Sequence, residues 1–276
     1  MLMRIITEPK LFREGKMTET GIYQCGRGPA VVTLHSSLSS GRQWLPLSSQ
    51  LKHDFSFFHV DLLRYGSAKK LDEGQLYRFD LEVERILHLL NELQINTPIH
   101  LVGHSCGGAL ALKFAVEYPE LVKSLTLFEP VAFHLLEEGS LFRRIADDFA
   151  RDVATHEGAK AAEIFTNFWN RAGFFAALPD KLKDLMAKDM KVVNQDFVAL
   201  TAETYTLAQL ANLDVPVFML AGKQSPALSR HLAQLIVDAL PNATIEHLDV
   251  GHMGPVNQSG IVQPRIAAFI EAVENS

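Results

Sequence analysis

One segment decides the fold, IHLVGHSCGGALAL at residues 99–112. A largely apolar, strand-like stretch comes first, then a Gly-x-Ser-x-Gly turn, then a run of small helix-forming residues. A serine between a strand and a helix takes a strained backbone conformation, and the glycines two residues on either side leave room for that turn. The hydroxyl of Ser105 then stands above the sheet, where the N-terminus of the following helix favours negative charge. Ser105 is therefore the predicted nucleophile.

The rest of the chain repeats the strand-then-helix order of this segment. Runs rich in apolar and β-branched residues predict buried strands at residues 30–34, 55–60, 99–102, 124–128 and 215–221. Helical patterns occur at residues 81–93, 107–117 and 263–273. This alternation predicts an α/β fold in which helices cover both faces of a mostly parallel central sheet. Residues 10–25 predict two short strands around turns, forming a hairpin at the edge of the sheet.

The alternation stops between residues 132 and 210, where helix-forming residues dominate and no strand-like run occurs. The predicted organisation is a core of residues 1–130 with 207–276, and an inserted helical cap of residues 131–206. The insertion carries an aromatic cluster, from which Phe165 and Trp169 are predicted to contact the substrate. Packing of the cap onto the sheet is the alternative role of these rings.

Length and composition exclude several classes of protein. The chain has 276 residues, 47% of them hydrophobic, which suffices for one large domain with a sizeable core and excludes disorder as the main state. The net charge is −6 and no stretch concentrates Lys and Arg, so neither nucleic acid nor an anionic membrane is an expected partner. Cys25 and Cys106 are the only cysteines, and no apolar run is long enough to cross a membrane, so we expect a cytoplasmic protein.

A histidine near the end of the sequence is placed to act on Ser105. A serine hydroxyl is a poor nucleophile at neutral pH and needs a histidine base beside it. The sequence offers His252 in the loop GHMGP at residues 251–255, after an apolar-rich segment and before the last predicted helix. The flanking glycines let this loop reach over the sheet edge, so His252 is the predicted general base. His231 and His247 fit surface positions on a helix and a strand instead.

A further turn, TLHSSLSSGRQW at residues 33–44, follows the first buried strand. Together with the nucleophile turn, the terminal Gly-His loop and DLLRYGS at residues 61–67, it resembles the α/β-hydrolase superfamily. The resemblance implies an α/β-hydrolase fold and an oxyanion hole made by the backbone N–H groups of Ser37 and Cys106. Ser36 replaces a glycine of the family in this turn. Ser36 and His104, which flank the two motifs, are predicted substrate contacts.

The acid that orients the histidine departs from the usual pattern of the family. Its usual position, within GKQSP at residues 222–226, holds Ser225, which carries no charge. Haloalkane dehalogenases place the acid after the strand that follows the nucleophile helix, and here that place holds Glu129. A charged residue at the end of an apolar run needs a partner, so Glu129 is predicted to contact His252. Asp249 is the alternative acid, and a purely structural role for Glu129 stays open.

These residues predict a serine hydrolase that cleaves a small carboxylic ester or related acyl compound through an acyl-serine intermediate. This chemistry requires neither a metal nor an organic cofactor, and the expected partner is a small apolar molecule. Three alternatives stay open: C–C bond hydrolysis, acyl transfer or a lyase reaction on the same residues; a non-catalytic ligand-binding protein; and a general esterase with no narrow substrate. The sequence also leaves the oligomeric state open, with a homodimer as one alternative.

Overall fold

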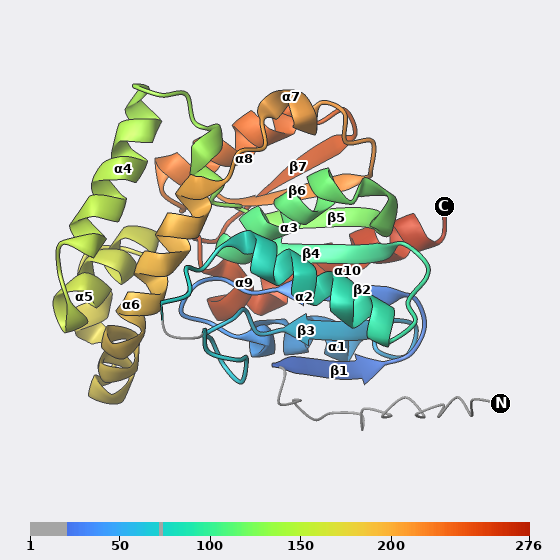
Figure 1. Cartoon of the computed structure of the whole chain (residues 1–276), viewed down its shortest axis with the longest axis horizontal. Helices are drawn as coiled ribbons and strands as arrows, with labels where there is room; N and C mark the ends of the chain where they lie inside the picture. The colour runs from blue at the N-terminus through green and yellow to red at the C-terminus, as the bar shows by residue number, and fades with distance from the viewer. Residues whose placement is uncertain (1–20, 72–73) are drawn as a thin grey trace.

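The computed structural model describes residues 21–71 and 74–276. A seven-stranded sheet with the order β1-β3-β2-β4-β5-β6-β7 runs through its centre (Figure 1). Strands β2 to β7 are parallel to one another, and the edge strand β1 pairs antiparallel with β3. The strands are β1 Ile22–Gly26, β2 Ala30–Leu34, β3 Ser56–Val60, β4 Ile99–His104, β5 Val122–Phe128, β6 Val217–Gly222 and β7 Ala243–Leu248.

The hairpin predicted at residues 10–25 is only partly within the described residues. Its second half contains β1, which lies at the sheet edge as predicted, with Cys25 opposite Phe57 of β3. The prediction placed the partner of this strand before it in the chain, at residues that lie outside the described part. Among the described residues, the partner of β1 is the later strand β3.

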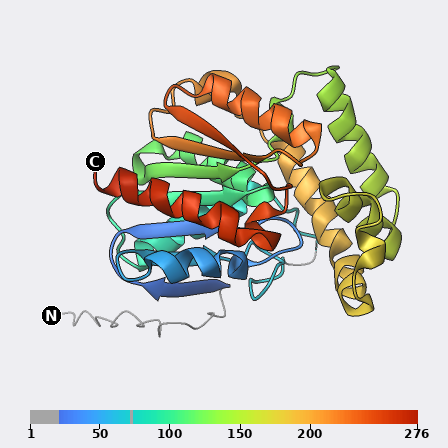
Figure 2. The same ribbon diagram turned by 180° about the vertical axis from the view of Figure 1, so that it is seen from behind.

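Helices cover both faces of the sheet, and alternate residues of each strand pack against different faces (Figures 1 and 2). In β2, Val32 and Leu34 join the apolar cluster of α2, α3 and α8, whereas Val31 joins that of α1 and α10. This two-sided burial explains why the strand lacks polar alternation. The covering helices are α1 Leu45–Leu51, α2 Phe79–Glu92, α3 Cys106–Glu117, α8 Ala227–Ala239 and α10 Ser259–Glu274. Within residues 21–71 and 74–276, no helix combines the length and the apolar composition of a membrane-spanning segment.

Between β5 and β6 the chain is described throughout and forms helices but no strand. Three of these helices lie together beside one end of the sheet (Figure 1), and α5 packs along α6. They are α4 Leu141–Ala154, α5 Gly158–Trp169 and α6 Asp180–Ala202, referred to below as the α4–α6 segment. The short elements are η1 Gly41–Trp44, η2 Pro119–Leu121, η3 Phe133–Leu135, η4 Phe175–Ala177, α7 Leu207–Leu210 and α9 Gly254–Asn257.

Two buried histidines connect strands to neighbouring loops, and both are held in the neutral form. Nδ1 of His35 donates to the carbonyl oxygen of Ser36 at 2.7 Å, and its Nε2 accepts the N–H of Leu62 at 2.9 Å. An imidazolium has no acceptor nitrogen, so protonation would break the second of these hydrogen bonds. Both ring nitrogens of His59 are hydrogen-bonded to hydroxyl groups. Burial lowers the pKa of His35 to about 4 and that of His59 to about 3.

These pKa values predict that acid destabilises the fold before most carboxylates titrate. In the unfolded chain a histidine takes up a proton below about pH 6.5, whereas His35 and His59 stay neutral when folded. The free energy of unfolding should therefore fall between pH 6.5 and about 4, by roughly 1.4 kcal/mol per pH unit for each histidine. Urea denaturation at a series of pH values measures this slope.

His59→Gln isolates the contribution of one histidine because it keeps an uncharged, hydrogen-bonding side chain. Between pH 6.5 and about 4, the unfolding free energy of this variant should fall less steeply with decreasing pH than that of the wild type. The difference in slope should be roughly 1.4 kcal/mol per pH unit, the contribution of one proton. His53→Gln, at an exposed position, is the matched control and should keep the wild-type slope. A slope unchanged by His59→Gln would show that this histidine is protonated equally in both states.

Candidate active site

Ser105 lies between β4 and α3 in a backbone conformation that side chains rarely adopt. Its φ is 55° and its ψ is −117°, a strained region that costs on the order of 1–3 kcal/mol. Its N–H donates to the carbonyl of Phe128 at 3.0 Å, and its own carbonyl accepts the N–H of Ala109 at 3.0 Å. A Cβ at Gly103 would lie 2.5 Å from the carbonyl oxygen of Gly107, so this turn needs glycine there. The turn thus fixes the Ser105 hydroxyl at the carboxyl end of β4.

The hydroxyl of Ser105 begins a hydrogen-bonded chain of three buried side chains. Ser105 Oγ lies 3.0 Å from Nε2 of His252, and Nδ1 of His252 lies 2.6 Å from Oε2 of Glu129. Because a carboxylate only accepts hydrogen bonds, Nδ1 carries the proton and Nε2 faces the hydroxyl as an acceptor. Such a chain can take the proton of the serine and stabilise the positive charge that forms on the histidine.

Three neighbouring strands bring this chain together. Glu129 follows β5, and its Oε1 accepts the N–H of Gly222 at the end of β6 at 2.7 Å. The backbone N–H of Glu129 also donates to Leu220 of β6 at 3.1 Å, and this residue has a positive φ of 44°. His252 lies in the loop after β7. Because the carboxyl ends of parallel strands meet at one edge, residues far apart in sequence converge there.

The structure places the two other residues considered for the acid position outside this chain. Asp249 is exposed, and its carboxylate accepts a hydrogen bond from Nε2 of Gln224 at 2.9 Å. Ser225 is buried, and its hydroxyl has no hydrogen-bond partner within the described part of the chain. The carboxylate in contact with His252 is that of Glu129.

A second set of hydrogen bonds connects the turn after β2 to the loop of His252. The N–H and Oγ of Ser36 donate to Oε1 of Gln43 at 3.3 and 3.2 Å, and Nε2 of Gln43 donates to Nδ1 of His104 at 2.9 Å. Nε2 of His104 then donates to the carbonyl oxygen of His252 at 2.9 Å. Each donor meets an acceptor only if His104 is neutral, and burial lowers the pKa of His104 well below its usual value, with the nearby His252 adding to the effect.

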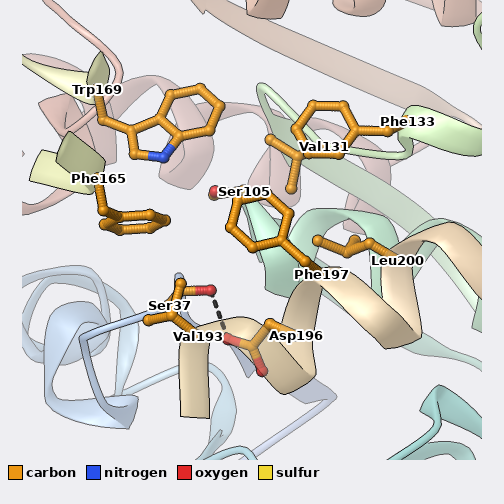
Figure 3. A pocket seen from close by; sticks show the side chains of 10 residues that line it. All are labelled: Ser37, Ser105, Val131, Phe133, Phe165, Trp169, Val193, Asp196, Phe197 and Leu200. Atoms are coloured by element: carbon orange, nitrogen blue, oxygen red, sulfur yellow. Dashed lines mark hydrogen bonds between the residues drawn. The ribbon is translucent and has the colours of Figure 1, made fainter. Parts of the chain in front are cut away.

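Two adjoining pockets lie between the core and the α4–α6 segment. The inner one, with a cavity volume of about 10 Å³, is lined by Ser37, Ser105, Val131, Phe133, Phe165, Trp169, Val193, Asp196, Phe197 and Leu200 (Figure 3). The outer one, of about 170 Å³, is lined by Ser37, Leu38, Ser39, Phe165, Thr166, Trp169, Asn170, Phe174, Met186, Met253, Val256 and Asn257. The two pockets share Ser37, Phe165 and Trp169, so these side chains lie where the inner pocket meets the outer one.

The four predicted substrate contacts divide into two pairs. Phe165 and Trp169 line both pockets, and the indole of Trp169 also stacks on the His252 ring at a centroid distance of 4.1 Å. Ser36 and His104 line neither pocket, because their polar groups are used in the hydrogen bonds through Gln43. Ser36 and His104 are buried and are absent from the linings of both pockets, so their contact with a substrate stays a prediction.

The two amides of the predicted oxyanion hole belong to residues of two separate turns, the one after β2 and the one between β4 and α3. Ser37 lines the inner pocket, and Cys106 is the first residue of α3, where helix N–H groups have no acceptor within the helix. No described residue accepts a hydrogen bond from either backbone N–H. The thiol of Cys106 is buried, and burial raises its pKa well above the usual value, so it stays protonated and unreactive.

Asp196 on α6 also lines the inner pocket and was not predicted from the sequence. Its buried carboxylate accepts hydrogen bonds from Ser37 Oγ at 2.7 Å, Tyr65 Oη at 2.5 Å and Arg64 Nη2 at 2.7 Å. Burial raises the pKa of this carboxyl, and the charge of Arg64 opposes that effect. The only sequence signal is its spacing from Val193 and Leu200, which places a charged residue on an apolar helix face.

A parallel sheet of this strand order, with a serine, a histidine and a carboxylate hydrogen-bonded at its carboxyl edge, defines a hydrolase of the α/β class. The comparison with protein families agrees: a family described as alpha/beta hydrolase fold matches residues 29–257. The chain belongs to this family.

Proteins that this chain resembles carry names for different activities. A Bacillus subtilis (strain 168) protein named for 2-succinyl-6-hydroxy-2,4-cyclohexadiene-1-carboxylate synthase activity is 24% identical over 255 residues, which is 88% of this chain and 91% of the relative. The enol-lactonase of Burkholderia xenovorans LB400 superposes with a TM-score of 0.73 at 17% identity, covering 91% of this chain and 95% of its own. The esterase EaEST of Exiguobacterium antarcticum superposes with a TM-score of 0.74 at 17% identity, covering 91% of this chain and 94% of the esterase. These two structural similarities support the fold alone.

Proposed function

We propose that the protein is a serine hydrolase that cleaves a small, uncharged carboxylic ester or related acyl compound through an acyl-serine intermediate. The observation that carries the proposal is the buried hydrogen-bonded chain from Ser105 through His252 to Glu129. Membership of the α/β-hydrolase family, and the esterase and lactonase among proteins of the same fold, support it. We further propose that residues 131–206 act as a cap that encloses the substrate.

The proposed reaction has two steps that use the same three side chains. His252 Nε2 takes the proton of Ser105 as Oγ bonds to the acyl carbon, and the tetrahedral oxyanion accepts hydrogen bonds from the N–H groups of Ser37 and Cys106. The C–O bond to the leaving alcohol then breaks, and His252 gives the alcohol its proton. In the second step His252 deprotonates a water whose oxygen bonds to the acyl carbon. The bond from that carbon to Ser105 Oγ then breaks, His252 returns the proton to Oγ, and the acid leaves. Glu129 stabilises the imidazolium in both steps.

The chemistry of the pocket walls favours a neutral, apolar substrate. Neither pocket is lined by a lysine or an arginine, and the one charged side chain in their walls is the carboxylate of Asp196. The charge of Asp196 is balanced by Arg64, so a carboxylate substrate would find no unpaired cation in these walls to form an ion pair with. The Bacillus relative is named for a carboxylate compound, so we propose that this chain acts on different molecules. A C–C bond hydrolase or a lyase on the same residues is the second candidate, favoured by that relative alone.

Replacing the proposed nucleophile tests the reaction class directly. Ser105→Ala should lower ester turnover by several orders of magnitude, as expected for a catalytic serine, and should abolish labelling by a fluorophosphonate probe. Ser225→Ala is the matched control, because Ser225 is also buried near the strand ends but lies outside the hydrogen-bonded chain. Labelling of Ser105→Ala at the wild-type rate would refute the assignment.

The proposed acid is tested by neutralising two carboxylates separately. Glu129→Gln keeps the shape of the side chain and removes the charge that stabilises the imidazolium, so turnover should fall roughly 10³- to 10⁴-fold. Asp249→Asn should have little effect, because this carboxylate is exposed and contacts Gln224. Steady-state kinetics on a chromogenic short-chain ester measures both, and a reversed ranking of the two variants would exclude Glu129 as the acid.

Adding Ser225→Asp to Glu129→Gln should restore part of the turnover if a carboxylate after β6 can reach His252.

The apolar outer pocket predicts a limit on substrate length. Each added methylene should improve kcat/KM by up to about 0.8 kcal/mol, roughly fourfold, until the pocket is full. Activity should rise from acetate to a medium-chain ester and fall for long chains. Phe174→Ala, which enlarges the outer pocket, should shift the optimum to longer chains, whereas Phe142→Ala, whose ring stacks on His231 outside the pockets, should not. An identical optimum in all three proteins would exclude the outer pocket as the binding site.

A further inference from the structure

We propose that Asp196 is a positioning residue that makes the proposed oxyanion hole depend on docking of the α4–α6 segment. This inference rests on the proposed function, because it assigns the backbone N–H of Ser37 to the stabilisation of an oxyanion. The new element is that α6 sets the orientation of this N–H in part. The contact is made by Asp196 of α6, which lies 159 residues after Ser37 in the chain.

The contacts of the Asp196 carboxylate connect α6 to two loops of the core. Oδ2 accepts hydrogen bonds from the hydroxyls of Ser37 and Tyr65, and Oδ1 accepts one from the guanidinium of Arg64 (Figure 3 shows the first). Ser37 lies in the turn after β2, and the two others lie in the loop after β3. The exposed fraction of the Asp196 side chain is 2%, so these contacts replace water almost completely.

Arg64 holds one turn of α6 independently of Ser37. Its Nη1 donates to the carbonyl oxygen of Val192 at 3.0 Å and to Oε1 of Gln195 at 2.8 Å. Its guanidinium also lies over the ring of Tyr77, 3.6 Å from the centroid. The backbone φ of Arg64 is 76°, an uncommon value for a residue with a side chain. This arginine thus fixes where α6 sits, and Asp196 extends the contact to the turn of Ser37.

Stability alone is a weak reason for this buried ion pair. Bringing two charges out of water costs about as much as their attraction returns, and apolar residues of the same size often stabilise a fold equally well. The neighbouring α6 residues in the inner pocket, Val193, Phe197 and Leu200, are apolar. A carboxylate among them gives the Ser37 hydroxyl a charged acceptor in a defined direction, which an apolar side chain cannot do.

The turn of Ser37 is held from two sides. On the core side, Ser36 donates through its N–H and hydroxyl to Gln43. On the other side, the Ser37 hydroxyl donates to Asp196. Leu38, the next residue, has a positive φ of 57°, so the turn is strained where these contacts end. Removing the contact to α6 leaves the turn of Ser37 with its core contacts only, those to Gln43 and to the Cys106 thiol.

The test is a double-mutant cycle on ester hydrolysis with Ser37→Ala, Asp196→Asn and the double variant. Each single change should lower kcat about 10- to 100-fold, less than the loss of a whole oxyanion donor, and should change KM by less than about threefold. The double variant should be no worse than the less active single variant, because the Ser37–Asp196 hydrogen bond is the interaction that both changes affect, whereas only Asp196→Asn also alters the contacts to Tyr65 and Arg64. Effects that multiply would overturn the coupling. Asp189→Asn, an exposed aspartate on the same helix, is the matched control.

Hydrogen exchange of peptides covering α6 separates positioning from general loosening. Ser37→Ala leaves the Arg64–Asp196 ion pair in place, so α6 should exchange at the wild-type rate while kcat falls. Ser37→Ala that accelerates exchange in α6 as much as Asp196→Asn would show a merely structural role. Fluorophosphonate labelling of the wild type distinguishes failure of the coupling from failure of the proposed function. If the wild type is labelled but the effects of the two substitutions on kcat multiply, the coupling alone is refuted. If the wild type is not labelled, the proposed function is refuted and the coupling with it.

Discussion

The hydrogen bond between Glu129 and His252 is the contact on which the arrangement of the site depends. It joins residues at the ends of β5 and β7, and β6, which lies between them, supplies the Gly222 N–H that binds the second carboxylate oxygen. A fully buried carboxylate is costly without such partners. The three strands must therefore end at the same level and the same edge, a condition that a parallel sheet meets and that also puts Ser105 of the neighbouring turn within reach of His252.

The groups beneath Ser105 are arranged so that only one of the two neighbouring histidines can take up a proton. The rings of His104 and His252 lie 5.2 Å apart, so a charge on the first would oppose a charge on the second. Hydrogen bonds from Gln43 and to the His252 carbonyl oxygen use both nitrogens of His104 in its neutral form. Burial lowers the pKa of His104 further, with His252 contributing. The proton of the proposed nucleophile thus has one acceptor, His252, whose charge is balanced by Glu129.

The sequence carried enough information for the sheet and for placing Ser105 and Glu129 at its edge, because each follows a strand whose two-sided burial leaves a continuous apolar run. His252 follows the edge strand β7, which is mostly exposed or half-buried, and its position was predicted from the glycines of its loop. The role of Asp196 could not be predicted from the sequence, because the partners of its carboxylate lie in loops more than 130 residues earlier. Only the docking of α6 brings these groups together. Ser36 and His104 were predicted at the pocket because they adjoin its motifs. Adjacency in sequence does not fix direction, and both side chains point into the core, where Gln43 binds them.

The α4–α6 segment excludes water from the site and also supplies part of the pocket walls. His252 is 1% exposed and Trp169, which stacks on its ring, is 5% exposed, so water is largely excluded from the hydrogen-bonded chain. Exclusion of water strengthens the interaction between the imidazolium and Glu129. It also restricts access, because a cavity of about 10 Å³ next to Ser105 holds little more than one water molecule. Phe165 and Trp169 line both this cavity and the outer pocket, so their rings lie where a substrate would pass from the outer pocket to Ser105. The indole of Trp169 thus has two roles, because it lines both pockets and packs on the ring of His252.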